Sequence, residues 1–383
     1  MSAEISRKLV ESLESRYAAY VDDLRLLTSI DCQTGYKPGL DEVAGHINSW
    51  LREMGASVTT IESRDVGNDV VAVLTGAGAK NVMLLCHTDT VYPLGTVSQR
   101  PFRIEGDRAI APGVCDMKGG LLAAIYALRA LDDIGYRDYG SITLLCNSDE
   151  EAAPRHSVDL IQNTARQAEC VLTMEPARMN GDVVSARKGV LVYSVTARGR
   201  EAHAGVNPDI GRNAIVALAD RILEIWKLNG KSPGLNVNPG LVRGGSAVNT
   251  VAGEAVCEID VRVTRTADIE TFDEMLRDIL TTSMIPDVTF EATKDHTMPP
   301  MEKTNASQRL VDLAQQAAQE IGFELADTFT GGGSDGAYAA QTGVPVLDGL
   351  GPIGGFAHSE REFLTLDSVV PRTALLARLI TLA

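Results

Sequence analysis

The sequence has few of the features that mark membrane, secreted or nucleic-acid-binding proteins. No apolar run in its 383 residues approaches the roughly 18 residues of a membrane-spanning helix. The first residues, Met1 to Lys8, carry charges where a signal peptide has an apolar stretch. Only 35 Lys and Arg stand against 51 Asp and Glu, and a net charge of −16 repels phosphate backbones and anionic lipids. We therefore expect a cytoplasmic protein that binds neither nucleic acid nor a membrane.

Cysteine is sparse and shows no pairing pattern. The six cysteines include no Cys-x-x-Cys pair, and internal repeats and low-complexity tracts are also absent. The cysteines are Cys32, Cys86, Cys115, Cys146, Cys170 and Cys257. Scattered thiols of this kind, several of them inside apolar runs, predict buried and reduced side chains rather than disulfides or a thiolate metal site.

The composition that remains is that of a folded protein with about two domains. Hydrophobic residues make up 44% of the chain and charged residues 22%, which is enough apolar material for a large core. A chain of 383 residues is longer than a single core usually organises, so we expect two domains or one domain with an insertion.

Short apolar runs and helical patterns alternate in the first half of the chain. The runs do not alternate with polar residues, as expected of strands that are buried on both faces. They span residues 69–74, 82–86, 142–146 and 170–174, with helical patterns at 3–28, 41–54 and 121–131. The same style returns near the C-terminus with a helix at 307–321, an apolar segment at 344–347 and a helix from Pro371. This order predicts an α/β domain with a mostly parallel sheet and flanking helices.

The pattern changes after about Ser185. Residues 254–263 alternate strictly between apolar and polar, which predicts a half-exposed antiparallel strand. Around them we expect strands at 189–198, 235–244 and 287–294 and helices at 213–229 and 269–284. The order β-α-β-β-α-β is a split βαβ unit. We therefore expect a catalytic domain in two segments, 1–185 and 294–383, around an inserted domain at 186–293.

Acids and one histidine follow three of the predicted buried strands. His87 and Asp89 follow the first, Glu150 and Glu151 the second, and Glu175 the third. The carboxyl ends of parallel strands meet at one edge of a sheet, where open α/β folds bind ligands. Carboxylates that are so close raise each other's pKa unless a cation neutralises them, so a metal site is the economical explanation. Ordinary surface turns would explain any one of these strand ends, but they explain all three poorly.

Three further residues become candidates only in combination. Asp116 lies in a glycine-containing loop before an apolar helix; a helix cap is the usual role of such an acid, and the phosphate-loop pattern is absent. His203 and His358 lie in loops of small residues, where a side chain can reach a ligand, although a loop histidine is usually unremarkable. His46 and His156 have the sequence surroundings of exposed histidines.

Taken in order, seven motifs resemble the M20 family of di-zinc peptidases and deacylases over nearly the whole chain. They are His87-Thr88-Asp89-Thr90, Gly113-Val114-Cys115-Asp116-Met117-Lys118-Gly119, Asp149-Glu150-Glu151, Met174-Glu175-Pro176, Ala202-His203-Ala204-Gly205, Gly331-Gly332-Gly333-Ser334-Asp335-Gly336 and Ala357-His358-Ser359. Within that family the chain resembles the glutamate carboxypeptidase, or carboxypeptidase G2-like, branch. The resemblance implies a zinc aminopeptidase-like catalytic domain and a ferredoxin-like lid that also forms a homodimer.

The resemblance also implies two zinc ions per subunit and assigns their ligands. Asp116 would bridge the two ions, His87 and Glu175 would complete one site, and Glu151 and His358 would complete the other. Glu150 would act as the general base and then as the acid, and Asp89 would orient His87. His203 would stabilise the oxyanion in the active site of a neighbouring subunit.

Substrate contacts follow from the same resemblance. Asn249 and Arg262 match family positions that touch substrate, although a lone arginine on a strand face is more often only solvated. The amides of Gly332 and Gly333 would form an anion-binding nest. Lys294 and His296 stand where the carboxypeptidase G2-like branch has arginines, so they depart from its pattern.

The sequence thus predicts a zinc-dependent amide hydrolase that releases a C-terminal amino acid, above all glutamate, from an N-acyl or peptidyl substrate by attack of a metal-bridging water. Three alternatives remain. One is an N-acyl-amino-acid deacylase of the acetylornithine deacetylase or succinyl-diaminopimelate desuccinylase kind. Another is a non-catalytic metal- or ligand-binding protein on the same fold. The third, a two-metal phosphohydrolase, is disfavoured because Arg262 is the only strong phosphate-binding candidate.

Overall fold

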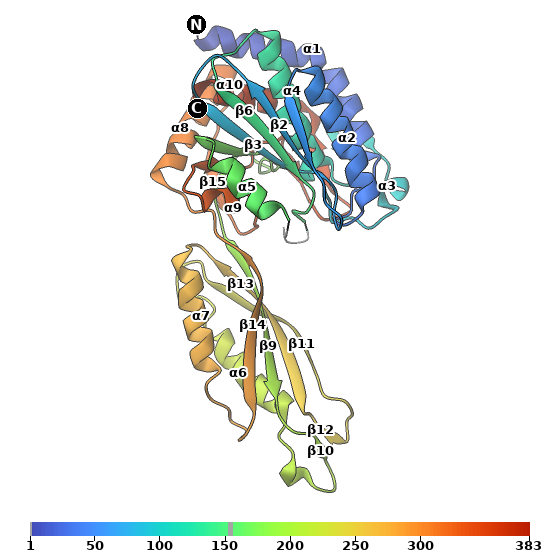
Figure 1. Cartoon of the computed structure of the whole chain (residues 1–383), viewed down its shortest axis with the longest axis vertical. Coiled ribbons are helices and arrows are strands. Elements are labelled where there is room, and N and C mark those ends of the chain that lie inside the picture. The colour runs from blue at the N-terminus through green and yellow to red at the C-terminus, as the bar shows by residue number, and fades with distance from the viewer. Residues whose placement is uncertain (1, 152–155) are drawn as a thin grey trace. The chain divides into compact units, whose positions relative to one another are not determined.

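The computed structural model describes residues 2–151 and 156–383, and these residues form two compact units (Figure 1). Of the described residues, the first unit comprises 2–151, 156–186, 303–329 and 334–383, and the second comprises 187–302 and 330–333. The domain division expected from the sequence ended the insertion at residue 293. In the structure the second unit continues to Glu302, because β14 (Thr289–Met298) runs past that point and Arg187 pairs with Met301.

The first unit is built on a mixed sheet with the strand order β1-β2-β6-β3-β7-β16. Four of its strands are parallel neighbours: β6 (Ser141–Asn147), β3 (Asn81–His87), β7 (Cys170–Thr173) and β16 (Val346–Leu347). On the other side β2 (Asp69–Thr75) and β1 (Ser57–Ile61) add antiparallel pairs. The mostly parallel α/β sheet predicted from the continuous apolar runs is confirmed. The half-exposed edge strand β1, which carries no such run, was missed.

Helices cover this sheet. One face, which includes Val82, Leu84 and Cys86 of β3, shares a core with the larger helices. These are α1 (Ser2–Thr28), α2 (Lys37–Glu53), α4 (Gly119–Asp133), α8 (Asn305–Ile321) and α10 (Val369–Leu382). The short α9 (Gly336–Ala340) packs on β7 and β16 and against α5 (Ser157–Ala165). Among the described residues no helix has the length and apolar character to cross a membrane.

Smaller elements complete the first unit around the end of the sheet. A second sheet joins β17 (Gly354–Gly355), β18 (Phe363–Thr365), β5 (Arg108–Ile110) and β4 (Arg103–Glu105) in that order. It brings the segment after Gly355 next to the turn Val114–Lys118, which precedes α4. The unit also contains α3 (Thr96–Gln99) and the paired strands β8 (Val183–Arg187) and β15 (Asp327–Thr330).

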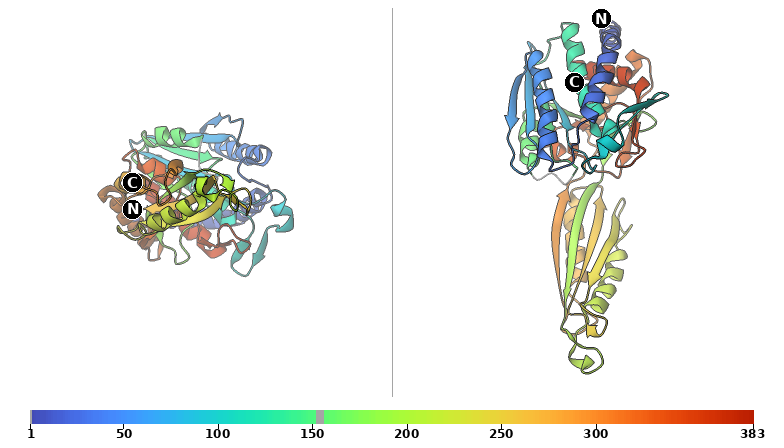
Figure 2. Two further views of the ribbon diagram at one scale, coloured as in Figure 1. Left: turned by 90° about the horizontal axis from the view of Figure 1, so that it is seen from below. Right: turned by 90° about the vertical axis from the view of Figure 1, so that its right-hand side faces the viewer.

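The second unit has the predicted order β-α-β-β-α-β. Its sheet runs β11-β13-β9-β14, with every neighbour antiparallel. The elements are β9 (Gly189–Arg198), α6 (Ala214–Trp226), β11 (Asn236–Gly244), β13 (Glu254–Val263), α7 (Ala267–Ile279) and β14, and the two helices lie on one face of the sheet (Figure 2). The buried residues of β13 alternate with partly exposed ones, as its sequence predicts. The short strands β10 (Ala202–His203) and β12 (Thr250–Val251) also pair.

The start of α4 depends on a glycine that lies against the backbone of the next segment. A Cβ at Gly120 would lie 1.9 Å from the carbonyl oxygen of Met174, an atom that cannot turn aside as a flexible side chain can. We predict that Gly120→Ala lowers the free energy of unfolding by about 1–3 kcal/mol, as overpacking does in other cores. Urea denaturation measures this change.

Gly45→Ala is the matched control. Gly45 lies in the middle of α2 and is exposed, and a Cβ there meets no atom within 4 Å. Alanine is the better helix former, so this substitution is expected to stabilise the protein by about 0.5–1 kcal/mol. Equal effects of the two substitutions would contradict the tight contact at Gly120.

Candidate metal centre

The three strand ends singled out in the sequence meet at one edge of the sheet. His87 is the last residue of β3 and lies beside Asn147, the last residue of β6, in parallel register. Glu150 and Glu151 follow β6, and Glu175 follows β7 on the other side of β3. The Nε2 atom of His87 lies 3.7 Å from Oε1 of Glu175. The expected clustering of acids with a histidine is therefore present.

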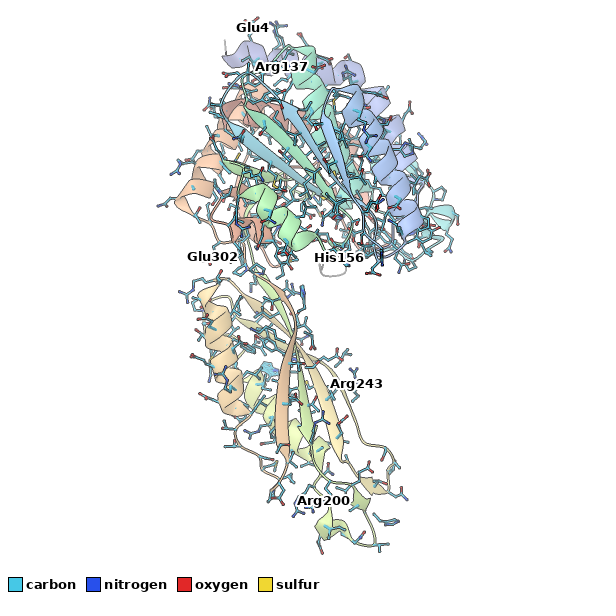
Figure 3. All side chains as sticks on the ribbon, in the orientation of Figure 1. Glu4, Arg137, His156, Arg200, Arg243 and Glu302 are labelled. Atoms are coloured by element: carbon cyan, nitrogen blue, oxygen red, sulfur yellow. The ribbon has the colours of Figure 1, made fainter. Side chains whose placement is uncertain are left out.

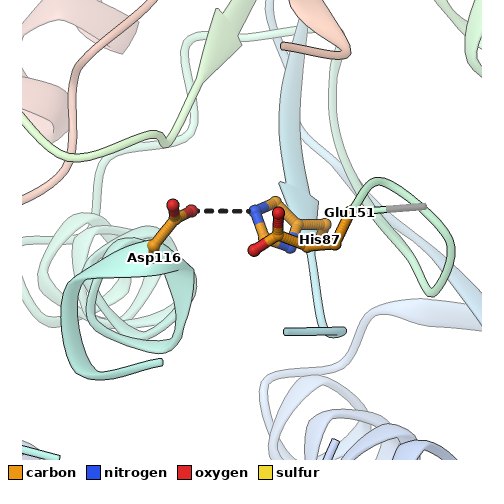
Figure 4. A group of neighbouring side chains, drawn as sticks. All are labelled: His87, Asp116 and Glu151. Carbon is orange, nitrogen blue, oxygen red and sulfur yellow. Dashed lines mark hydrogen bonds and ion pairs between the residues drawn. The ribbon is translucent and has the colours of Figure 1, made fainter. Parts of the chain in front are cut away.

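Asp116 lies between the two histidines of this cluster. One of its oxygens, Oδ1, is 3.2 Å from Nε2 of His87 (Figure 4). Its other oxygen, Oδ2, is 3.3 Å from Nε2 of His358. A carboxylate that presents one oxygen to each of two histidines has the geometry of a bridging ligand.

Glu151 and His358 form the other half of the cluster. Nε2 of His358 lies 3.0 Å from Oε2 of Glu151. His358 reaches this position with a backbone φ of 63°, a left-handed conformation that is uncommon for residues other than glycine and that often marks functional sites. His87, Asp116 and Glu151 each offer a donor atom within 4.8 Å of the others, so the two halves of the cluster face one common space.

The composition and spacing of these donors fit zinc. All donors are imidazole nitrogens or carboxylate oxygens, the ligands that catalytic zinc sites use. Bonds of about 2.0–2.1 Å around a tetrahedral ion put neighbouring donors roughly 3.3 Å apart, which matches the distances between the histidines and Asp116. Glu151 also keeps a buried oxygen, Oε1, that accepts no hydrogen bond among the described residues. A cation would satisfy this oxygen.

Asp89 fixes the segments that carry the cluster. It is completely buried, and its carboxylate accepts hydrogen bonds from the backbone N–H groups of Glu150 (3.2 Å) and Glu151 (3.0 Å) and from the hydroxyl of Thr34 (2.6 Å). Nδ1 of His87 lies 3.1 Å from the backbone oxygen of Asp89 and 3.4 Å from the carboxylate of Asp89. Asp89 therefore contacts His87, as expected, and also holds the two glutamates that follow β6.

The acids in this cluster perturb one another strongly. Burial raises the pKa of Glu150 well above its ordinary value; His87 opposes this shift, while Asp335, Glu175 and Glu151 add to it. Burial likewise raises the pKa of Glu151, against the opposing hydrogen bond from His358. Both shifts favour the protonated carboxyl, so each of these groups holds a proton more readily than an exposed glutamate does.

The histidines take up the opposite charge. Hydrogen bonds to Asp116 and then to Glu151 raise the pKa of His358 to about 10. Burial lowers the pKa of His87, but hydrogen bonds to Asp116 and Asp89 outweigh burial and raise it overall. Burial raises the pKa of Asp116, but the two histidines outweigh it and lower that pKa. Without a cation, protons on the histidines offset the acids, and metal binding would displace those protons.

The other candidate residues belong to the second unit and form two separate groups there. His203 and Asn249 lie together, because His203 pairs with Thr250 and the backbone N–H of Ala204 donates to the oxygen of Asn249 at 2.9 Å. His203 is exposed, and its Nδ1 accepts from the N–H of Gly205 at 3.1 Å. The exposure leaves its other ring nitrogen accessible to a ligand.

The second group contains Arg262 and the glycine loop. Arg262 has a protein partner as well as solvent, because its guanidinium donates hydrogen bonds of 2.9 and 3.1 Å to the carboxylate of Asp260. It also donates to the oxygen of Gly331 at 3.4 Å. The carbonyls of Gly332 and Gly333 accept from the guanidinium of Arg187, at 3.3 and 3.0 Å. Lys294, the departure noted above, is paired with Asp273.

One acid of the site was missed in the sequence. Glu362, four residues after His358, is buried and accepts hydrogen bonds from the loop that carries Asp116. The sequence does offer one indication of its role: Glu362 directly precedes the apolar pair Phe363-Leu364, a position at which a charged side chain is expected to be buried.

Comparisons with known proteins agree with this site and fold. The model of peptidase family M20/M25/M40 matches residues 83–382. Carboxypeptidase G2 of Pseudomonas sp. (strain RS-16) is 33% identical over 97% of this chain and 91% of its own. Succinyl-diaminopimelate desuccinylase of Alkalilimnicola ehrlichii is 28% identical over 72% and 76% of the two chains. The crystal structure of aminopeptidase PepT from Bacillus cereus superposes with a TM-score of 0.78 at 19% identity and covers 95% of this chain and 98% of that one.

The protein is therefore an enzyme, a metallopeptidase or amidohydrolase that acts on carbon–nitrogen amide bonds. The chain belongs to peptidase family M20/M25/M40. The enzyme class, the family and the fold expected from the sequence are confirmed.

Proposed function

We propose that the protein is a zinc-dependent carboxypeptidase-type amide hydrolase that releases a C-terminal amino acid, above all glutamate, from an N-acyl or peptidyl substrate. The observation that supports this most is Asp116, whose two oxygens face His87 and His358 at 3.2 and 3.3 Å. The likeness to carboxypeptidase G2 over 97% of the chain supports the choice of a C-terminal amino acid.

In this proposal five residues hold two zinc ions. Asp116 would be shared by the two sites, His87 and Glu175 would complete one of them, and Glu151 and His358 would complete the other. When bound, such a pair polarises the substrate carbonyl and lowers the pKa of water to near neutrality. The 3.7 Å contact of His87 with Glu175 and the 3.0 Å contact of His358 with Glu151 support this division of the ligands.

Glu150 is the proposed general base. Glu150 and Glu151 are adjacent in the bend and turn that follow β6, and the carboxylate of Glu151 faces His358, which leaves Glu150 to move protons. Glu150 takes a proton from the attacking water and delivers it to the leaving amine. The raised pKa of Glu150 suits both steps, and the hydrogen bond from its backbone N–H to Asp89 fixes its position.

The proposed substrate contacts come from the second unit. His203 stabilises the oxyanion that forms on the carbonyl, acting in the active site of a neighbouring subunit. Asn249, Arg262 and the amides of Gly332 and Gly333 bind the amino acid, whose free carboxylate pairs with the guanidinium fork of Arg262. Asp260 now occupies that fork, so substrate binding exchanges one carboxylate for another.

A second candidate activity is removal of an acyl group from a basic or dibasic amino acid. The likeness to a succinyl-diaminopimelate desuccinylase over 72% of the chain favours it. Lys294 and His296 also stand where the carboxypeptidase G2-like branch has arginines, and this difference favours the second activity over release of glutamate.

A substrate panel combined with Glu150→Gln tests this function. We expect the zinc-loaded wild type to release glutamate from acyl-glutamate and folate-like amides faster than it deacylates acetylornithine or succinyl-diaminopimelate. Glu150→Gln should lower kcat by about 10²–10⁴-fold and leave the zinc content unchanged, because a general base contributes about that much and Glu150 is no ligand.

Glu42→Gln, an exposed position on α2, is the control and should retain full activity. Turnover of the acetylated and succinylated basic amino acids alone would contradict the proposed substrate. Full activity of Glu150→Gln would contradict the assignment of the base.

We also propose a cytoplasmic homodimer that forms through the second unit. Ile215, Val216, Leu223 and Trp226 of α6 are exposed although apolar, at 42%, 42%, 64% and 51%. β11 lies at the edge of its sheet and exposes Leu241 and Val242 beside Arg243, which pairs with Glu258 (Figure 3). A second copy can pair its own β11 with this edge and cover the apolar side of α6. The six buried, unpaired cysteines support a reducing compartment.

Trp226→Glu tests the dimer. A charge on the apolar side of α6 should convert the protein from twice the mass of one chain to a monomer in sedimentation velocity. The monomer should stay folded, because this side chain is already half exposed. Met284→Glu, at a site that is 58% exposed and outside α6 and β11, should leave the dimer intact. A monomeric wild type would contradict the proposed dimer.

A further inference from the structure

Glu362 is a buried acid without a role in the reaction proposed above. Its exposed fraction is 1%, and all its hydrogen bonds among the described residues come from neutral donors. Three donors are backbone N–H groups of the loop that carries Asp116: Gly113 at 2.8 Å, Cys115 at 2.9 Å and Asp116 itself at 3.1 Å. The fourth is the hydroxyl of Tyr92 at 2.6 Å.

These contacts join three segments that carry candidate ligands. Tyr92 lies five residues after His87, and its hydroxyl is also 3.0 Å from the backbone oxygen of Ser359, next to His358. The loop Gly113–Asp116 carries the carboxylate between the two histidines. Glu362 is itself four residues after His358 and directly precedes β18. One carboxylate therefore connects the segments of His87, Asp116 and His358.

The four donors are divided evenly between the two carboxylate oxygens. Oε1 accepts from Cys115 and Asp116, and Oε2 accepts from Gly113 and Tyr92. Each oxygen thus receives two donors, and an amide NH₂ group in place of either oxygen could accept from neither of its two. The loop needs these acceptors, because its irregular backbone pairs few of its N–H groups within a helix, and a buried N–H without an acceptor is costly.

We propose that Glu362 is the positioning residue of the metal centre, which sets the Asp116 carboxylate between His87 and His358 and thereby determines the affinity for metal. This inference rests on the proposed metal ligands. Glu362 contacts no metal in this proposal. It acts through the backbone of Asp116, because the N–H that it binds belongs to the ligand itself. Partners of ligands that are held in this way typically change metal affinity by about 10–100-fold when they are replaced.

Glu362→Gln tests the proposal, because glutamine has nearly the same shape but presents an NH₂ group in place of one oxygen. In either orientation of the amide, that NH₂ group faces at least one backbone N–H of the loop. Zinc affinity is measured by competition with a chromophoric chelator, and the melting temperature of the zinc-free protein is measured separately. We expect zinc to bind about 10–100-fold more weakly. The zinc-free protein should also melt at a somewhat lower temperature, because one buried N–H loses its acceptor.

Two further variants complete the test. Tyr92→Phe removes one of four donors and keeps the carboxylate, so its zinc affinity should fall between those of the wild type and Glu362→Gln. Glu360→Gln, at an exposed residue two positions away in the same segment, should bind zinc as the wild type does. The absorption spectrum of bound Co²⁺ should change in Glu362→Gln and stay unchanged in Glu360→Gln, since only the first alters the position of a ligand.

Each outcome separates the alternatives. Wild-type zinc affinity in Glu362→Gln would overturn the proposal, and a lowered melting temperature with unchanged affinity would show a purely structural role and overturn it too. If Glu362→Gln does not fold, Tyr92→Phe decides, and wild-type affinity in that variant overturns the proposal. A wild-type protein that binds no zinc would instead contradict the proposed function.

Discussion

The repulsion among carboxylates at the edge of one sheet is the constraint on which the site depends. The ends of the parallel strands β6, β3 and β7 and the turn before α4 bring four acids around His87: Asp116, Glu150, Glu151 and Glu175. Burial makes the negative charges of these acids more costly. Such a group is stable only with compensating positive charge. In the chain alone the two histidines supply it as protons. In the proposed enzyme two bound cations would supply it and would polarise the substrate carbonyl. The protein keeps a costly group of acids because the cation that neutralises it is the source of its chemistry.

The acids around the centre divide into two kinds by their partners. Asp116 and Glu151 face histidine nitrogens, as metal ligands do. Asp89 and Glu362 instead accept hydrogen bonds mainly from backbone N–H groups and hydroxyls of the segments that carry those ligands. Asp89 holds the residues after β6, and Glu362 holds the turn before α4. Loops lack the regular backbone hydrogen bonds of helices and strands. Here one buried carboxylate in each case accepts hydrogen bonds from the N–H groups of a loop and so holds the ligands of that loop in place.

The sequence predicted those parts of the molecule that local patterns encode. Continuous apolar runs located β2, β3, β6 and β7, and strict alternation gave β13 at its observed limits, Glu254–Val263. The clustering of His87, Glu151 and Glu175 followed from the parallel arrangement of strands. Glu362 could not be found in this way, because its partner Asp116 is 246 residues away and the contact depends on the short strands β17 and β18. Asp260, by contrast, lies two residues from Arg262 on the same face of β13, so their pairing was within reach of the sequence.

The central claim is that Asp116 lies between two metal ions. It is tested most directly by anomalous scattering at the zinc absorption edge from crystals of the zinc-loaded protein. The account predicts two anomalous peaks per subunit, one beside His87 and Glu175 and the other beside Glu151 and His358, with one oxygen of Asp116 directed to each. A single peak, or two peaks of which only one contacts Asp116, would contradict it.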